Sequence, residues 1–451
     1  MLVLKTSVSQ GTGGSNPSLS GYLNTMKKNF IFVLIAIFSL ITLFYSHFAV
    51  KKPVIYGDGI GYYSYVYNFF EFGDLSFTNT EAPRFGVNTQ EELPNNLNKY
   101  PVGTSLFLLP AYISAKITTV LFSPDRAGIT AYTTAHHVFV GLFGIAYLLL
   151  ALKILQKILL RFFDEKTTNI TLVSIALGTN LLLYSSAEAS FSHLYSFLAI
   201  NLFLYLLIKW RELQNKKTSI LLGLSVGLVL LLRQSNITIL AIFLFYGIEL
   251  SSFKESIQSQ ITFYKKNAKN LALIVLSALG TFLPQVIYWL YATGKLIIYS
   301  YKDENFDFLR PQIFQALFGM ERGLFFWAPI LIIAVCGVWF AKKHLKNISL
   351  GLIVFMAINM YIVSSWWMWD YGVGHGHRAF TDFLGIFALW FAVLISELSN
   401  YKLLRRILLV ALPILIFINL AFAIGYLKQR IYYTDTTFTN ILEPVVKFRF
   451  K

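Results

Sequence analysis

The segment from residue 364 to residue 378, SSWWMWDYGVGHGHR, holds a dense group of side chains that could do chemistry. Three tryptophans within four residues are typical of the layer where a membrane meets water. Glycines then give the backbone freedom, and His375, His377 and Arg378 bring hydrogen-bonding or positive groups together. Two histidines one residue apart could bind a divalent metal, but the sequence shows no clear further ligands. We therefore favour a site for an anion such as phosphate.

A single acidic residue follows the first long apolar block. Asp58 lies between Gly57 and Gly59, which allow a tight turn and a close approach to a ligand. A carboxylate here could act as a general base, or it could cap a helix that begins near Ile60. Tyr62 follows on an expected amphipathic helix at the membrane interface, where aromatic rings suit lipid headgroups and sugar faces.

Four further segments contribute candidates. Glu188 and His193 lie on a tight turn and could form an acid–base pair or supply two metal ligands, unless the turn is simply satisfied by water. Arg233 either anchors to lipid headgroups or binds an anion. Arg322, at the start of a span, is placed to reach a lipid phosphate, unless it pairs with Glu321 or simply anchors the span. Lys99 could contact phosphate, although we favour a lysine that snorkels to the interface.

The composition indicates the class of protein that carries these residues. The chain has 451 residues, of which 56% are hydrophobic and 13% charged. A soluble domain carries about a quarter charged residues, so a soluble globular enzyme is excluded. The single Cys336 rules out a disulfide framework and cysteine metal sites. We predict an all-α polytopic membrane protein.

Apolar blocks long enough for membrane crossing predict about 11 transmembrane helices. They lie near 29–50, 128–152, 170–187, 191–208, 218–232, 236–250, 270–291, 323–341, 348–366, 379–397 and 407–426. The further apolar segment 101–122 is expected to lie in the interface or to re-enter, because counting it as a span would place the basic segment 153–166 outside, against the positive-inside rule.

The formal net charge of +16 has a topological explanation. With the amino terminus in the cytoplasm, most of the excess falls on short inner loops, and every histidine except His344 lies at or near the outer face. Nucleic acid is therefore not an expected partner. The inner loops contain no nucleotide-binding motif, so an activated substrate would not be a cytosolic nucleotide.

Three regions follow along the chain. Residues 1–25 lack a signal sequence, and we expect them to be disordered or to precede the true start at Met26. Residues 26–426 form the membrane domain, in which the long outer loop 51–127 contains interfacial helices. Residues 427–451 form a short outer tail.

Four segments taken in order resemble the GT-C superfamily of polytopic glycosyltransferases, which includes protein O-mannosyltransferases and the lipid A aminoarabinose transferase. The acidic first loop (56–58) and the entry into a juxtamembrane helix (99–103) come first, followed by the start of a late span (323–329) and the tryptophan-rich segment (366–378). The resemblance extends from Met26 to about residue 400.

The resemblance implies a polyprenyl-phosphate-linked sugar donor, inversion at the anomeric carbon, and an active site on the outer face of a bacterial inner membrane. Asp58 matches the catalytic acidic residue, which would deprotonate the hydroxyl of a lipid, glycan or protein acceptor. Donor phosphate would be bound by Arg378, His377, His375, Arg322 and Arg233. Acceptor binding or acid–base support would come from Glu188, His193, Tyr62 and Lys99.

Two departures limit what the resemblance implies. Asp58 is followed by glycine instead of a second acidic residue, and the usual Pro-Pro is Pro101-Val102. The acceptor class and the dependence on metal therefore stay open. No cofactor is certain, and a divalent metal remains an alternative whose ligands the sequence does not identify. The alternatives are a transporter or flippase for lipid-linked glycans and a non-catalytic assembly subunit. A transporter would be expected to carry ionisable residues at mid-span, whereas those of this chain cluster at span ends.

Overall fold

The computed structural model describes residues 19–79, 85–88, 94–123 and 132–431, together with residues 436, 437, 439, 441 and 443. The expected amino-terminal extension lies outside these residues as far as residue 18, and residues 19–25 belong to the first helix. Most of the tail 427–451 also lies outside them.

The described residues are almost entirely helical. In chain order the α-helices are α1 (Leu19–Phe44), α2 (Asp58–Phe72), α3 (Gly103–Phe122), α4 (Thr134–Leu159), α5 (Glu165–Leu177), α6 (Leu181–Tyr184), α7 (His193–Leu213), α8 (Lys216–Leu232), α9 (Leu240–Leu244), α10 (Phe253–Lys266), α11 (Ala268–Thr293), α12 (Ile313–Phe318), α13 (Leu324–Trp327), α14 (Ile330–Cys336), α15 (Ala341–Leu345), α16 (Ser349–Ser364), α17 (Leu384–Leu398) and α18 (Lys402–Leu427). A π-helical turn covers Tyr45–Ala49, and 3₁₀ turns cover Gln234–Ile239, Leu250–Ser252, Gly337–Phe340, Lys346–Ile348 and Arg378–Phe383. Two short strands, β1 (Val87–Asn88) and β2 (Leu97–Asn98), pair antiparallel.

Eight helical stretches in the described part of the chain are long and apolar enough to cross a membrane. They are Phe30–Ala49, Gly103–Phe122, Thr134–Leu159, His193–Leu213, Ala268–Thr293, Ile330–Ser364, Arg378–Leu398 and Lys402–Leu427. The chain is therefore an all-α polytopic membrane protein, as its composition predicts.

The number of stretches differs from the eleven predicted spans for local reasons. Segment 170–187 is divided, because α5 ends at Leu177 and α6 is a separate short helix. Segment 236–250 contains a 3₁₀ turn and the five-residue α9, and α8 has 17 residues. Segments 323–341 and 348–366 contribute to one continuous stretch.

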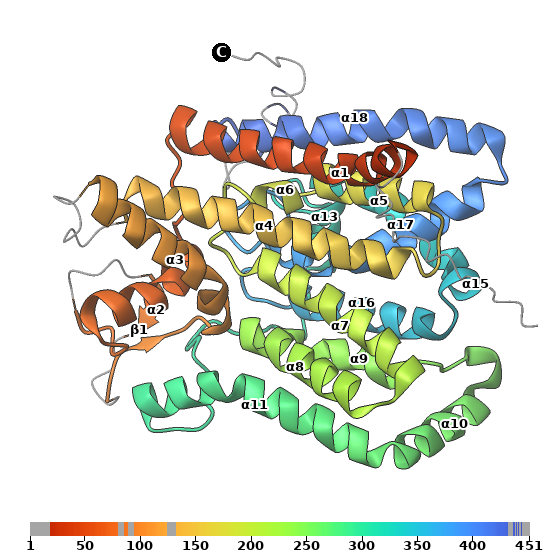
Figure 1. Cartoon of the computed structure of the whole chain (residues 1–451), viewed down its shortest axis with the longest axis horizontal. Helices are drawn as coiled ribbons and strands as arrows, with labels where there is room; N and C mark the ends of the chain where they lie inside the picture. Colours follow the sequence, from red (N-terminus) through yellow and green to blue (C-terminus); the bar gives the residue numbers. More distant parts are fainter. Residues whose placement is uncertain are drawn as a thin grey trace, which may run out of the picture.

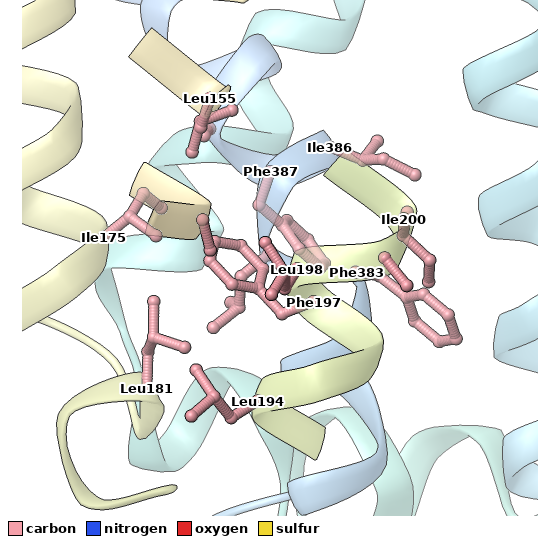
Figure 2. Packing of buried hydrophobic residues seen from close by; sticks show 14 of the residues in the cluster. Leu155, Ile175, Leu181, Leu194, Phe197, Leu198, Ile200, Phe383, Ile386 and Phe387 are labelled. Atoms are coloured by element: carbon pink, nitrogen blue, oxygen red, sulfur yellow. The ribbon is translucent and has the colours of Figure 1, made fainter. Parts of the chain in front are cut away.

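The centre of the bundle is formed by α7 and α17. In the 18-residue apolar windows of the stretches that contain them, 83% and 94% of the residues are buried, against 17% for the window in α11. Figure 2 shows Phe197 of α7 and Phe387 of α17 packed together, with Leu155 of α4 and Ile175 of α5 beside them. Figure 1 places α18 along one edge of the bundle and α11 along the opposite edge.

The two ends of the bundle differ in character. At one end the segment between α1 and α2 meets the end of α18, where the hydroxyls of Tyr56 and Tyr426 are 3.2 Å apart. We call this the loop end; α2 and α3 lie there, at the left of Figure 1. At the other end Lys343 of α15 lies 2.6 Å from Glu397 of α17. We call this the basic end, because the lysines and arginines that end α4 and α7 and begin α8 gather there.

Both ends of α3 lie at the loop end, although the helix is one of the eight stretches above. Gly103 backs onto the end of α8 so closely that a Cβ atom there would lie 2.3 Å from the carbonyl oxygen of Leu231. Near the other end, the hydroxyl of Thr119 is 3.3 Å from that of Thr133, which immediately precedes α4. A helix placed in this way does not run the length of the bundle.

Candidate active site

Asp58 is the first residue of α2 and faces two donors across the loop end. Its Oδ2 lies 2.9 Å from Nη2 of Arg378, and its Oδ1 accepts a hydrogen bond of 2.8 Å from the hydroxyl of Tyr100. The side chain keeps 24% of its surface exposed. Gly57, with a φ of +50°, occupies the cap position, and the Asp58 carboxylate faces side chains instead of capping the helix.

The electrostatic balance keeps Asp58 ionised. Burial alone would raise the pKa of Asp58, but the Arg378 guanidinium and the Tyr100 hydroxyl outweigh it and lower that pKa below its ordinary value. His193 and Lys99 act in the same direction. An ionised carboxylate with part of its surface accessible can accept a proton from a hydroxyl that reaches it.

Arg378 owes its position to the glycines before it. A Cβ at Gly374 would lie 2.6 Å from the hydroxyl of Tyr184, and Gly376 has a φ of +62°. Neither place suits a larger residue. The Arg378 guanidinium lies over the ring of Phe191, 5.2 Å from its centroid. Its Nε is buried without a hydrogen-bond partner in the described structure.

A second carboxylate, Asp382, organises the neighbouring group. Its Oδ1 lies 2.8 Å from Nδ1 of His193, and its Oδ2 lies 3.7 Å from Nε of Arg233 and accepts a 3.1 Å hydrogen bond from Asn236. Asp382 is only 1% exposed. Asp382 is not among the residues predicted from the sequence, although an acidic residue inside an apolar stretch is the signal that could have found it.

Glu188 binds different partners from His193, so the two do not form the acid–base pair considered from the sequence. Its Oε1 accepts hydrogen bonds from Lys52 at 2.7 Å, from Tyr426 at 2.6 Å and from Tyr56. Burial would raise the pKa of Glu188, but Lys52 and the two tyrosine hydroxyls lower it below the ordinary value.

Tyr62 and Lys99 flank the site. The Tyr62 hydroxyl donates to Ser192 at 3.1 Å, and its ring centroid is 4.8 Å from that of Tyr100. Lys99 forms an ion pair with Glu304, and its ammonium lies 5.2 Å from the ring centroid of Tyr301. Lys99 is therefore engaged with this loop, which differs from the snorkelling role we favoured.

Unlike Arg233 and Arg378, Arg322 forms no salt bridge among the described residues. The residue is 1% exposed, and among the described residues its guanidinium donates only to the backbone carbonyls of Gly372, at 3.2 Å, and Glu321. Its Nη2 is buried without a hydrogen-bond partner in the described structure. Burial lowers the pKa of Arg322 from its very high ordinary value. A buried guanidinium with a free donor is chemically suited to an anion.

His375 and His377 do not supply positive charge. Burial lowers the pKa of His375 to about 4 and that of His377 to about 3. The ring of His375 meets Trp327 edge to face at 5.2 Å, whereas His377 packs at 4.7 Å on Phe380. The two histidines therefore have different neighbours. Among the described residues no group of three or more His, Cys, Asp or Glu side chains could hold a metal ion.

Comparisons with protein families and with curated proteins find no match. Solved structures that match include forms of the oligosaccharyltransferase of Archaeoglobus fulgidus. One, of AglB with an inhibitory peptide and a dolichol-phosphate, is 12% identical with a TM-score of 0.48 and covers 90% of this chain and 56% of that one. The apo form is 14% identical with a TM-score of 0.49 and covers 95% of this chain and 55% of that one.

The chain thus spans about half the length of these structures. A likeness at such values does not identify an activity. What the fold and the site define is a class: a polytopic α-helical membrane protein with a cluster of carboxylates, arginines and tyrosines at one end of its bundle.

Proposed function

We propose that the chain is an inverting membrane glycosyltransferase of the GT-C type. It moves a sugar from a polyprenyl-phosphate carrier to a hydroxyl group of a lipid, a glycan or a protein. The observation that carries this proposal is the Asp58 carboxylate, ionised, partly exposed, and set between the Tyr100 hydroxyl and the Arg378 guanidinium.

In the proposed reaction the acceptor hydroxyl donates its proton to Asp58. The acceptor oxygen forms a bond with the anomeric carbon of the donor sugar, and the bond from that carbon to the phosphate oxygen breaks. Polyprenyl phosphate leaves with the electron pair, and attack from the face opposite the leaving group inverts the anomeric configuration. A phosphate leaving group needs little protonation, so one base and nearby cations are enough.

The arginines have separate parts in this proposal. Arg322 is free of a carboxylate in the described structure and would bind phosphate directly. Arg378 and Arg233 lie beside Asp58 and Asp382, and would share their charge with the phosphate as it develops. Neutral His375 would contribute hydrogen bonds and no charge.

The loop end would face the outside of the membrane. The basic end supports this orientation, because lysines and arginines are enriched on the cytoplasmic side of membrane proteins. We place the chain in a bacterial inner membrane, with its amino terminus in the cytoplasm. Any divalent metal would be an addition for which the described side chains provide no ready cluster.

The test is sugar transfer by the purified chain in vesicles that contain a short-chain polyprenyl-phosphate sugar and a mixture of hydroxyl acceptors. Transfer by the wild type and its loss in Asp58→Asn are expected. Equal transfer by both would overturn the role of Asp58. No transfer by the wild type with any donor would favour a transporter or an assembly subunit, and flipping of labelled lipid would identify the former.

A further inference from the structure

The turn between α6 and α7 is polar in sequence but buried in the structure. Glu188, Ser190 and Ser192 are each at most 1% exposed. The turn is held from behind, because the hydroxyl of Tyr195 donates to the carbonyl of Ala189 at 2.6 Å. A buried and anchored turn of this kind is a rigid surface, unlike the water-satisfied turn considered from the sequence.

Alternate residues of this turn hold the segment that carries Asp58. Glu188 accepts from Lys52 and Tyr56, as described above. The hydroxyl of Ser190 donates to the carbonyl of Val54 at 2.7 Å. Ser192 accepts from Tyr62 at 3.1 Å. These three residues of the turn therefore contact the chain on both sides of Asp58.

Two closer contacts fix the same segment. Gly59 lies so near the turn that a Cβ atom on it would be 1.9 Å from the hydroxyl oxygen of Ser190. The ring of Phe191 lies 5.2 Å from the ring of Tyr56 and also supports the Arg378 guanidinium. Phe191 thus contacts both Tyr56, which lies two residues before Asp58, and Arg378, which forms the ion pair with Asp58.

We infer that the turn 187–193 is the positioning element for Asp58, with Glu188 as its central residue. The inference rests on the proposed function. Glu188 is fully buried, its Oε1 accepts from three donors, and its Oε2 is buried without a hydrogen-bond partner in the described structure, so we assign it a positioning role instead of contact with the acceptor. It acts through Lys52 and Tyr56, which fix the loop ahead of Gly57 and Asp58.

The first experiment compares Glu188→Gln with a matched control, Glu397→Gln. Glu397 is also a largely buried carboxylate bound by a lysine and a histidine, but it lies at the basic end. Glu188→Gln should lower kcat about 10- to 100-fold with little change in KM, because a displaced base slows the chemical step. Hydrogen exchange of residues 54–62 should become faster in Glu188→Gln, whereas Glu397→Gln should change neither kcat nor this exchange.

The second experiment leaves the buried ion pair intact. Gly59→Ala should lower kcat, because its methyl group collides with Ser190. Adding Ser190→Gly removes the two colliding atoms and leaves the nearest remaining atom of residue 190 at 3.5 Å. Because Ser190→Gly also removes the hydrogen bond to Val54, the double variant should recover kcat to the level of Ser190→Gly alone and above that of Gly59→Ala, a rescue that general destabilisation would not give.

The outcomes separate the two proposals. Faster exchange of 54–62 without any sugar transfer by the wild type would retain the positioning role and reject the glycosyltransferase. Sugar transfer by the wild type with unchanged exchange in Glu188→Gln, or with no rescue by Ser190→Gly, would reject the positioning role alone.

Discussion

The guanidinium of Arg378 lies 2.9 Å from the carboxylate of Asp58, where the first loop meets the stretch that leads into α17. The proposed reaction needs both groups, and in the structure each neutralises the other. A donor phosphate that engages Arg378 competes with Asp58 for its charge. The carboxylate would then become a stronger base when the donor is bound.

Removal of the base should stop the reaction without preventing donor binding. We expect Asp58→Asn to lower kcat about 10²–10⁴-fold, the usual contribution of a general base. The dissociation constant for polyprenyl phosphate should stay within a few-fold of the wild type, measured on the same vesicles. Wild-type turnover by Asp58→Asn would contradict the assignment.

The pH dependence of kcat/KM should reveal the Asp58–Arg378 pair. Asp58 acts when ionised and its pKa is lowered, so wild-type activity should persist as pH falls and decline only below the ordinary range of a carboxylic acid. In Arg378→Gln the effect of burial prevails and raises the pKa of Asp58, so the decline in kcat/KM should begin at higher pH. Acid limbs that coincide in the two proteins would show that the pair does not control the base.

Arg322 should control donor affinity. Arg322→Gln removes a buried guanidinium that faces no carboxylate in the described structure, and we expect polyprenyl phosphate to bind about 10- to 100-fold more weakly, as for the loss of a charged hydrogen bond. The matched control is Arg310→Gln, because Arg310 is exposed. Equal affinities of the two variants would place the phosphate elsewhere.

Asp382 should matter for stability as well as for activity. Asp382→Asn removes the charge that faces His193 and Arg233, and loss of one partner of a buried pair costs about 3–5 kcal/mol. The free energy of unfolding in detergent should fall by an amount of this order. Asp303→Asn, on an exposed loop, should change it by less than about 0.5 kcal/mol. An equal effect of the two changes would contradict the buried role of Asp382.

Helix packing offers a test that needs no activity. A Cβ atom at Gly337 would lie 1.8 Å from the carbonyl oxygen of Trp390 in α17, so Gly337→Ala should lower stability by about 1–3 kcal/mol. At Gly280, in α11, nothing lies within 4 Å of such an atom, and Gly280→Ala should leave thermal unfolding unchanged or raise its midpoint. The reverse order would contradict the packing of α17.

The fold class could be predicted from the sequence because it follows from composition and from hydropathy along the chain. Length, low charge and long apolar blocks state that the chain crosses a membrane by helices. The positions at which apolar blocks break into separate helices could not be predicted in the same way. The short α6 and α9 depend on how neighbouring helices cover them, and an apolar block alone cannot state whether it is one helix or two.

The site could be predicted only in part. Asp58 and Arg378 stand out because charged residues beside glycines at the edge of apolar blocks are unusual. The role of Asp382 could not be predicted, since it depends on a partner, His193, from another helix. Glu188 and His193 are close in sequence yet face different partners, Lys52 and Asp382, which come from segments far apart in the chain.

Hydropathy along the chain specifies that this protein folds in a membrane and which residue types lie at the interface with water. Which carboxylate faces which cation depends on how the helices pack. Hydropathy acts residue by residue along the chain, whereas an ion pair forms between groups brought within a few ångströms by helix ends far apart in sequence. The Asp58–Arg378 pair is therefore a property of the packed bundle.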